Sequence, residues 1–250
     1  QSAGQSFNRV NKFVTSDMTF GLTFGAAADT LIGTSVSDYI VGSAANDTID
    51  GKLGFDAIYG KAGDDQIVFE STSWIDGGIG ADTISAAAAS TGVAIEFGAA
   101  SNRVSNVEYL LGSAYADKLG GSSATETLEG GAGADSLWGG AGADSLLGGA
   151  GADSYWFGAS DGQDTIALDS GNYLDSVYFY GTGVGGGGIT STIVSGDNLT
   201  IGLSTGNSLT LLGWASGTST QKLNKFYFEE DGKTYSLAVD GSNVATWTAI

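Results

Sequence analysis

Acidic residues recur at intervals of nine residues in two separate stretches of the chain. The later stretch holds Asp117, Glu126, Asp135, Asp144 and Asp153, and the earlier one holds Asp29, Asp38, Asp47, Asp56 and Asp65. Glycine precedes nearly all of them by five positions, and an apolar residue follows each by two. Carboxylates beside uncovered backbone carbonyls offer only hard oxygen ligands, which calcium takes in sets of about six to eight. The spacing therefore predicts rows of calcium sites.

Each nine-residue unit reads as one turn followed by one short strand. The glycine-rich half can adopt positive φ and form a tight turn. The second half places one apolar side chain inward, because alternate residues of a strand face opposite sides. Two units then complete one coil, so turns eighteen residues apart stack on the same edge. Magnesium fits such turns less well, because it demands a tighter octahedron and keeps its waters.

The predicted calcium ligands are the acidic residues and turn glycines of the most regular units. They are Asp47, Gly60, Gly63, Asp65, Gly77, Gly80, Asp82, Asp117, Gly130, Gly131, Gly133, Asp135, Gly139, Gly140, Gly142, Asp144, Gly148, Gly149, Gly151 and Asp153. We expect Asp117, Asp135 and Asp153 along one edge and Asp144 on the other. In the earlier array, Asp47 and Asp65 are the preferred ligands.

The composition excludes most other chemistry. The absence of histidine and cysteine excludes Ser-His-Asp and Cys-His catalysis, zinc sites built on imidazole or thiolate, and disulfides. A net charge of −19 makes nucleic acid and anionic membrane surfaces poor partners. No apolar run reaches the roughly 18 residues of a membrane span. Two G-x-S-x-G strings, at 158–162 and 202–206, arise by chance among 42 glycines. We therefore expect neither an enzyme nor membrane insertion.

The repeat resembles that of the RTX (repeats-in-toxin) family, whose consensus is G-G-x-G-x-D-x-U-x. The match is close in "GGIGADTIS" (77–85), "GGAGADSLW" (130–138) and "GGAGADSLL" (139–147). It is partial at 51–59 and 60–68, and weak at 33–41, 42–50 and 121–129, where glycines are lost. The resemblance implies a parallel β-roll that binds several calcium ions. The weak turns are expected to stack without calcium or to bind it poorly.

The tail alternates apolar and polar residues between Gly and Asp turns, which predicts short strands. Its aromatics are numerous enough for a core: Tyr173, Tyr178, Phe179, Tyr180, Trp214, Phe226, Tyr227, Phe228 and Tyr235. The tail is similar to the C-terminal domains that follow RTX arrays in proteins exported by type I secretion. That resemblance implies an uncleaved C-terminal export signal, which agrees with the lack of a visible leader. Capping of the roll by the tail is the plainer alternative, and the two are compatible.

The predicted fold is all-β: a parallel β-roll followed by a C-terminal β-strand cap or sandwich-like region. The predicted parts are an N-terminal extension at 1–24, a roll at 25–165 and the tail at 166–250. The roll's arrays, at 25–85 and 112–157, are joined by irregular β coils.

The predicted function is that of a secreted protein, outside the cell or on its surface, which folds on calcium. Its expected partners are calcium and the type I secretion machinery. The first hypothesis is that the protein self-associates into a filament or surface layer. In this hypothesis an N-terminal strand within Phe7 to Phe24 pairs with the strand edge of a neighbouring molecule. A monomer capped by its own ends is the alternative, as is the C-terminal carrier domain of a larger adhesin or enzyme.

Overall fold

The computed structural model describes residues 10–12, 27–70, 73–97, 103–168, 175–181, 188–214, 223, 225–239 and 245–250. The chain divides into two compact units. Unit 1 consists of Gln1–Ala88 with Gly98–Val107, and unit 2 of Ala89–Phe97 with Glu108–Ile250. Strands and turns make up the described residues, and none of them forms a helix long and apolar enough to cross a membrane.

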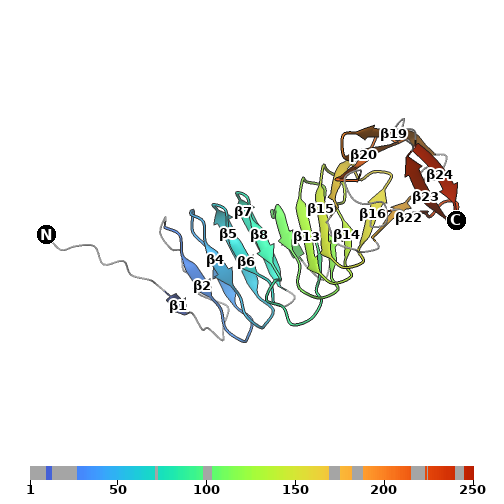
Figure 1. Ribbon diagram of the computed structural model, residues 1–250. Helices are drawn as coiled ribbons and strands as arrows, with labels where there is room; N and C mark the ends of the chain where they lie inside the picture. The colour runs from blue at the N-terminus through green and yellow to red at the C-terminus, as the bar shows by residue number, and fades with distance from the viewer. Residues whose placement is uncertain are drawn as a thin grey trace. The chain divides into compact units, whose positions relative to one another are not determined.

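Unit 1 is built from two sheets between which the chain alternates (Figure 1). One has the order β1-β2-β4-β6-β8, made of Val10–Lys12, Thr30–Ile32, Thr48–Asp50, Gln66–Val68 and Thr83–Ser85. The other has the order β10-β7-β5-β3, made of Arg103–Ser105, Trp74–Ile79, Ala57–Ala62 and Tyr39–Val41. Every pairing in both sheets is parallel. The nine-residue period therefore gives one strand to each sheet in turn, as predicted.

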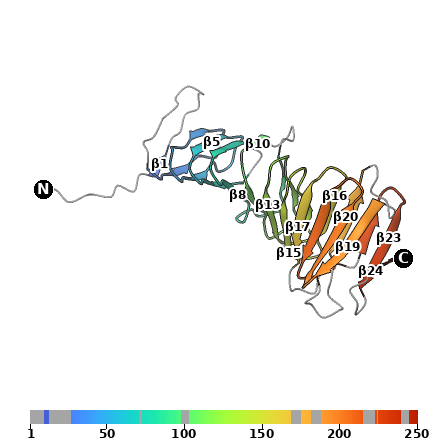
Figure 2. The ribbon, with the colours of Figure 1, turned by 90° about the horizontal axis from the view of Figure 1, so that it is seen from above.

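Unit 2 continues this pattern and adds antiparallel hairpins at its C-terminal end (Figure 2). The β15 sheet has the order β11-β13-β15-β17-β21-β20-β19, made of Tyr109–Leu111, Thr127–Ala132, Ser145–Ala150, Gln163–Ala167, Ser208–Leu212, Asn198–Leu203 and Ile189–Ser195. The β16 sheet has the order β9-β12-β14-β16-β18-β22-β23-β24, made of Ala94–Glu96, Lys118–Gly120, Ser136–Trp138, Ser154–Gly158, Ser176–Tyr180, Lys225–Phe228, Lys233–Val239 and Ala245–Ala249. The predicted parallel β-roll is confirmed.

The parallel pairing of unit 2 goes on past residue 165, the predicted end of the roll. Strand β17 pairs with β21 and β18 pairs with β22, both in parallel. Only then do β19, β20, β23 and β24 add antiparallel strands. The Trp247 indole N–H donates to Thr192 Oγ1 (3.3 Å), which links the two terminal hairpins. The tail therefore first extends the roll and then covers its end.

The core of the nonapeptide repeats is a column of side chains, with one large apolar side chain from each short strand from β2 up to β15. Leu119 lies opposite Leu137, and Leu137 lies opposite Tyr155. All three are at most 1% exposed. In unit 1, Ile49, Ile67 and Ile84 form the same kind of column. This thin core leaves the turns, rather than apolar packing, to hold adjacent coils together along each edge.

The tail aromatics divide between core and surface because they alternate along their strands. Phe179 packs against Phe228 with ring centroids 4.7 Å apart, and Phe226 is also fully buried. Tyr178, Tyr180 and Tyr227 are only half-buried, so the expectation that they form core is wrong. Tyr173 lies outside the described residues.

Two other predicted segments are described in part. The region between the arrays holds the short strands β9 and β10 in place of a helix, as expected from its β-branched residues. Of the predicted N-terminal strand, the structure describes Val10–Lys12, which pairs in parallel with β2 of the same chain. Phe7, Phe20, Leu22 and Phe24 lie outside the described residues.

Removing one side chain from the column should weaken the whole coil. Leu137→Ala should lower the free energy of unfolding by about 2–5 kcal/mol, because stacked parallel strands cannot close around the cavity. Leu212→Ala is the matched control, since Leu212 lies in a strand of the same unit but is 37% exposed. Its effect should stay near ~0.5 kcal/mol. Urea unfolding of the calcium-loaded protein measures both, and equal losses would contradict the column.

Candidate calcium sites

The acidic residues of the repeats lie in rows, joined by hydrogen bonds from one coil to the next. The Asp117 backbone N–H donates to Asp135 Oδ1 (2.8 Å), and the Asp135 N–H donates to Asp153 Oδ1 (2.9 Å). On the other edge, the Glu126 N–H donates to Asp144 Oδ1 (2.8 Å). The structure therefore places Asp117, Asp135 and Asp153 in one row and Asp144 in another.

Unit 1 has two rows of the same kind. In the first, the N–H groups of Asp29, Asp47 and Asp65 donate to the Oδ1 atoms of Asp47, Asp65 and Asp82, respectively, at 2.7–2.8 Å. In the second, the Asp38 N–H donates to Asp56 Oδ1 (2.9 Å), and Ser73 follows in the place of a carboxylate. One oxygen of each of the carboxylates of Asp47, Asp56, Asp65 and Asp82 is thus used to align the coils.

Two row members were missed by the sequence analysis. The Asp144 N–H donates to Asp164 Oδ1 (3.1 Å), and the Asp153 N–H donates to Asp175 Oδ1 (2.9 Å). These pairs are 20 and 22 residues apart instead of 18, because longer turns interrupt the nine-residue count. The signal that could have found them is the apolar residue two positions later, Ile166 and Val177, which keeps the repeat's spacing.

The second oxygen of several row carboxylates is buried without a hydrogen-bond donor. Among the described residues, this holds for Oδ2 of Asp56, Asp65, Asp135, Asp144 and Asp164. A buried carboxylate oxygen with no donor costs free energy, because water no longer solvates its charge. Each of these carboxylates therefore needs a positively charged partner, and the described part of the protein does not supply one.

The first glycine of each regular unit marks where that partner would bind. A Cβ on Gly130 would meet both Asp135 Oδ2 and, at 2.6 Å, the carbonyl oxygen of Gly148 in the next coil. A Cβ on Gly60 would meet Asp65 Oδ2 and the Gly77 carbonyl in the same way. Gly77, Gly139 and Gly148 likewise stand against the carboxylates of Asp82, Asp144 and Asp153. A side chain would fill this space, so glycine keeps it open.

The remaining predicted glycines shape the turns. Positive φ occurs at Gly63, Gly80, Gly131, Gly133, Gly140, Gly142, Gly149 and Gly151. At Gly133 (φ 133°), a Cβ would also lie 2.7 Å from the carbonyl oxygen of Tyr115, one coil earlier. Lys52 (φ 64°) and Lys61 (φ 83°) hold this conformation without being glycine, which costs strain. The Lys52 ammonium lies 2.5 Å from Asp50, an ion pair that offsets part of that cost.

The oxygen atoms of these sites are suitable ligands for calcium. The described residues contain no group of three or more His, Cys, Asp or Glu side chains that could hold an ion. The sites at Gly60 and Gly130 instead offer one carboxylate together with a backbone carbonyl from the next coil. Oxygen donors of this kind suit a large hard cation with a flexible coordination shell. Bound there, calcium would supply the missing positive charge, with Asp135 Oδ2 and the Gly148 carbonyl among its ligands.

The irregular turns satisfy their carboxylates differently. Asp117 Oδ2 accepts the Ser113 N–H (2.6 Å), and Asp117 Oδ1 accepts the Ser113 hydroxyl (2.9 Å). Asp47 Oδ2 accepts the Ser43 N–H (2.6 Å) in the same position of its turn. Serine thus replaces the second glycine and provides donors that the regular turns lack. Of the predicted ligands, Asp47 and Asp117 are consequently less dependent on an ion than Asp65 and Asp135.

Burial raises the pKa of the carboxyls that lack donors. The pKa of Asp65 and of Asp135 is raised to about 6. That of Asp144 is raised to about 7 and that of Asp164 to about 8. Loss of hydration is the main cause, and neighbouring carboxylates add to it, while hydrogen bonds from the backbone oppose it. Without a cation, these carboxyls therefore ionise at higher pH than exposed carboxyls do, and those with pKa values of about 7 and 8 are only partly ionised at neutral pH.

The calcium-free chain should fold better in acid than at neutral pH. A carboxyl whose pKa is raised from 3.8 to about 6 stabilises the folded state fully below about pH 4. That contribution is lost as the pH rises through 6 to 8. Circular dichroism in a chelator should show more β structure at pH 4.5 than at pH 8, whereas calcium should restore it at pH 8. More β structure at pH 8 in the chelator would contradict these pKa shifts.

Neutralising one regular carboxylate should weaken calcium binding more than neutralising an irregular one. Asp135→Asn keeps the acceptor for the Asp117 N–H but removes a ligand charge, so the calcium concentration at half-folding should rise about tenfold. Asp117→Asn should cause a smaller rise, because Ser113 already serves that carboxylate. Asp197→Asn, in an exposed turn, is the control and should change nothing. Calcium titrations followed by circular dichroism decide, and equal effects of D135N and D197N would contradict the site.

Known proteins share this repeat. The profile of the RTX calcium-binding nonapeptide repeat matches in four copies, at residues 25–58, 41–71, 73–89 and 120–155. No curated protein sequence matches the chain. Among solved structures, the extracellular lipase LipA from Serratia marcescens is similar at 18% identity and a TM-score of 0.28, over 79% of this chain and 40% of the lipase.

A second solved structure that is similar is the AlgE6R3 subunit of the Azotobacter vinelandii mannuronan C5-epimerase. It shares 26% identity at a TM-score of 0.17, over 44% of this chain and 78% of the subunit. The repeat profile, the parallel coils and the rows of carboxylates agree on one assignment. The chain carries RTX calcium-binding nonapeptide repeats, which lie within residues 25–89 and 120–155.

Proposed function

We propose that this protein is a secreted, non-catalytic structural module that folds when it meets calcium outside the cell. The observation that carries the proposal is the set of buried carboxylate oxygens without donors, four of which, in Asp56, Asp65, Asp135 and Asp144, stand against the first glycine of their turn. A structure with such rows is unstable until a cation enters them. Calcium binding and folding are then one event, as in other small metal-dependent domains.

The charge of the chain supports the same coupling. A net charge of −19 opposes compaction, and the single-residue columns of the core do little to offset it. Extracellular calcium modules bind at about 10⁻⁴–10⁻³ M, far weaker than cytosolic sensors. At low cytosolic calcium the chain would therefore stay unfolded and could be threaded through an export channel. RTX repeat proteins are generally secreted, and we propose the type I route with the tail as the export signal.

Contacts at the two ends of the roll are relevant to whether the protein self-associates into a filament or layer. Strand β1 pairs with β2 of its own chain, and the Trp247–Thr192 bond links the terminal hairpins of unit 2. Strand β1 covers the edge of β2 in its own chain, so donation of the N-terminal strand to a neighbour requires β1 to be released. These contacts favour a capped module, attached to or carried by a larger secreted protein, over the end-to-end filament.

The proposal predicts a calcium-dependent transition. In EDTA at pH 7.5 the chain should lack a β spectrum, and millimolar calcium should produce one, because only calcium completes the rows. Magnesium at the same concentration should not replace it, since it keeps its waters and its tighter octahedron. Circular dichroism measures the transition, and a β spectrum that survives chelation would refute the proposal.

Sedimentation of the same calcium-loaded sample separates the two assemblies. A capped module should give one monomeric boundary at tens of micromolar protein. Large species that vanish when residues 1–24 are removed would instead establish assembly through the N-terminal strand. In that case the carrier reading would be abandoned, while calcium-coupled folding would stand.

A further inference from the structure

Aromatic side chains form an outward-facing row across the β16 sheet of unit 2. Trp156 lies opposite Tyr178, and Tyr178 lies opposite Tyr227, on three neighbouring parallel strands. Trp138 follows Leu137 on the next strand, β14, where Leu137 is paired with Tyr155. The row therefore spans four strands, or about 14 Å at the usual strand spacing. Trp156 is 38% exposed, so much of this large apolar ring is in contact with solvent and is not buried in the core of unit 2.

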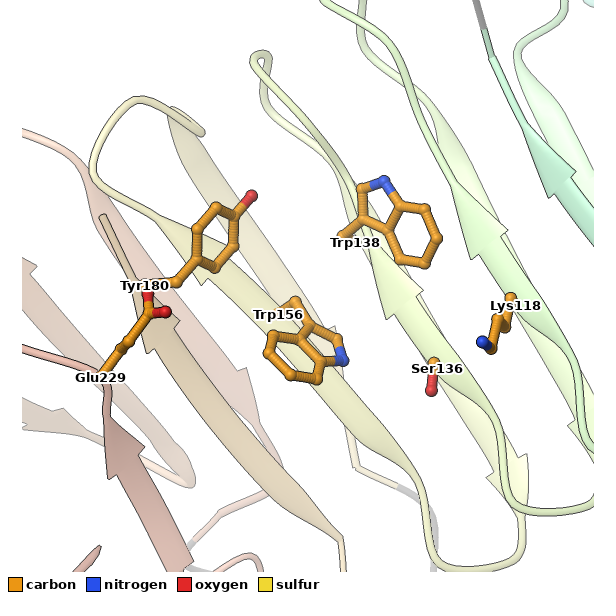
Figure 3. Close-up of a pocket in the computed structure, with 6 residues that line it drawn as sticks. All are labelled: Lys118, Ser136, Trp138, Trp156, Tyr180 and Glu229. Atoms are coloured by element: carbon orange, nitrogen blue, oxygen red, sulfur yellow. The ribbon is translucent and has the colours of Figure 1, made fainter. Parts of the chain in front are cut away.

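The rings of this region pack closely, and Trp156 stacks on Tyr178 with ring centroids 4.5 Å apart and an angle of 16° between the ring planes. A Cβ on Gly120 would collide with the Trp138 indole, its Cζ2 atom lying at 2.5 Å, so that ring covers Gly120 on the next strand. A Cβ on Gly158 would lie 2.9 Å from the Tyr180 ring, so Tyr180 covers Gly158 in the same manner. In Figure 3 the broad faces of both indoles are toward the viewer, and the Tyr180 ring plane is inclined by 58° to that of Trp156. Glycine on the adjacent strands thus lets Trp138 and Tyr180 lie low against the sheet, and with Trp156 they form an aromatic platform.

Polar side chains border the platform. A shallow cavity of about 490 Å³ is lined by Lys118, Ser136, Trp138, Trp156, Tyr180 and Glu229. In Figure 3, Lys118 and Ser136 lie on one side of Trp156, and Glu229 lies on the other side near Tyr180. The Tyr180 hydroxyl is held by Asp161 Oδ2 at 3.1 Å. The cavity therefore combines an apolar aromatic floor with one cationic, one hydroxyl and one anionic group at its margins.

The chemistry of this cavity selects among ligands. Single-stranded nucleic acid also stacks on aromatic rings, but its backbone requires a cationic groove, and this chain carries a net charge of −19. Polyanionic ligands are disfavoured for the same reason. A neutral pyranose has an apolar C–H face that matches an aromatic ring and a rim of hydroxyls that bond to Lys, Ser and Glu. A chain of β-linked pyranoses is flat and extended, as a row across four strands requires.

We propose that the aromatic row of the β16 sheet is a binding site for a neutral β-linked polysaccharide. Trp138 and Trp156 stack on successive sugar rings, and Lys118, Ser136 and Glu229 bond to their hydroxyls. The site is part of unit 2 and is independent of the assembly discussed above. It would attach the calcium-folded roll to a polysaccharide surface without any catalysis.

Titration calorimetry of the calcium-loaded full chain with cellohexaose and with chitohexaose tests this proposal. Wild-type protein should bind at least one of them, and Trp156→Ala should weaken binding about tenfold or more, the loss expected for one stacked aromatic ring. Tyr109→Ala is the matched control, since Tyr109 is an exposed aromatic (44%) on β11 in the other sheet of unit 2. It should bind like the wild type. Circular dichroism in calcium confirms that each variant is folded, and Trp156→Phe keeps the test valid if the alanine variant does not fold.

Three outcomes would overturn the proposal. One is no binding of either oligosaccharide by the folded wild type. Another is equal binding by the Trp156 and Tyr109 variants. The third is a wild-type dimer in sedimentation that Trp156→Ala dissociates without any sugar, which would make the row an interface between two copies of the chain.

Discussion

A buried carboxylate oxygen that has no donor is the constraint on which this fold depends. In the turn of Asp135, one carboxylate oxygen accepts a backbone N–H from the preceding coil, and the other borders the same space as a backbone carbonyl of the next coil. The protein supplies nothing positive at that point. The turns can stack only if the charge is removed by a proton or balanced by a cation. At neutral pH the carboxyls of Asp56, Asp65 and Asp135, with pKa values of about 6, are mostly ionised, so we propose that calcium decides whether the chain is folded.

Other features of the architecture are consistent with these buried carboxylate oxygens that have no donor. The core needs only one apolar side chain per strand, because ions rather than packing hold the edges together. The turns need glycine where a Cβ would fill the ion's space, as at Gly130, and where stacked turns approach closely, as at Gly133. The irregular turns, with Ser43 and Ser113, satisfy their carboxylates by hydrogen bonds and so can stack with less calcium. Strong and weak calcium dependence are thereby combined within one roll.

Much of this could be predicted from the sequence, because a strict nine-residue period fixes both the register and the edge of each residue. Asp135 and Asp144 fall in separate rows for that reason alone. The prediction failed where the period breaks: Asp164 and Asp175 continue the rows after longer turns, which residue counting does not detect. It also treated the tail aromatics as core, although strand alternation turns Tyr178 outward beside the buried Phe179. The hydrogen bonds that relieve Asp117 depend on atomic positions within the turn and have no signature in the spacing.

A crystal structure of the protein grown in calcium, with diffraction data collected for the anomalous signal of that ion, tests the account most directly. The account predicts anomalous peaks between stacked turns of the rows, in contact with Asp135 Oδ2 and the Gly148 carbonyl in unit 2 and with Asp65 Oδ2 in unit 1. The peak at Asp117 should be weaker or absent, because Ser113 occupies that carboxylate. A folded roll whose rows carry no peak at Asp65, Asp135 or Asp144 would contradict the account.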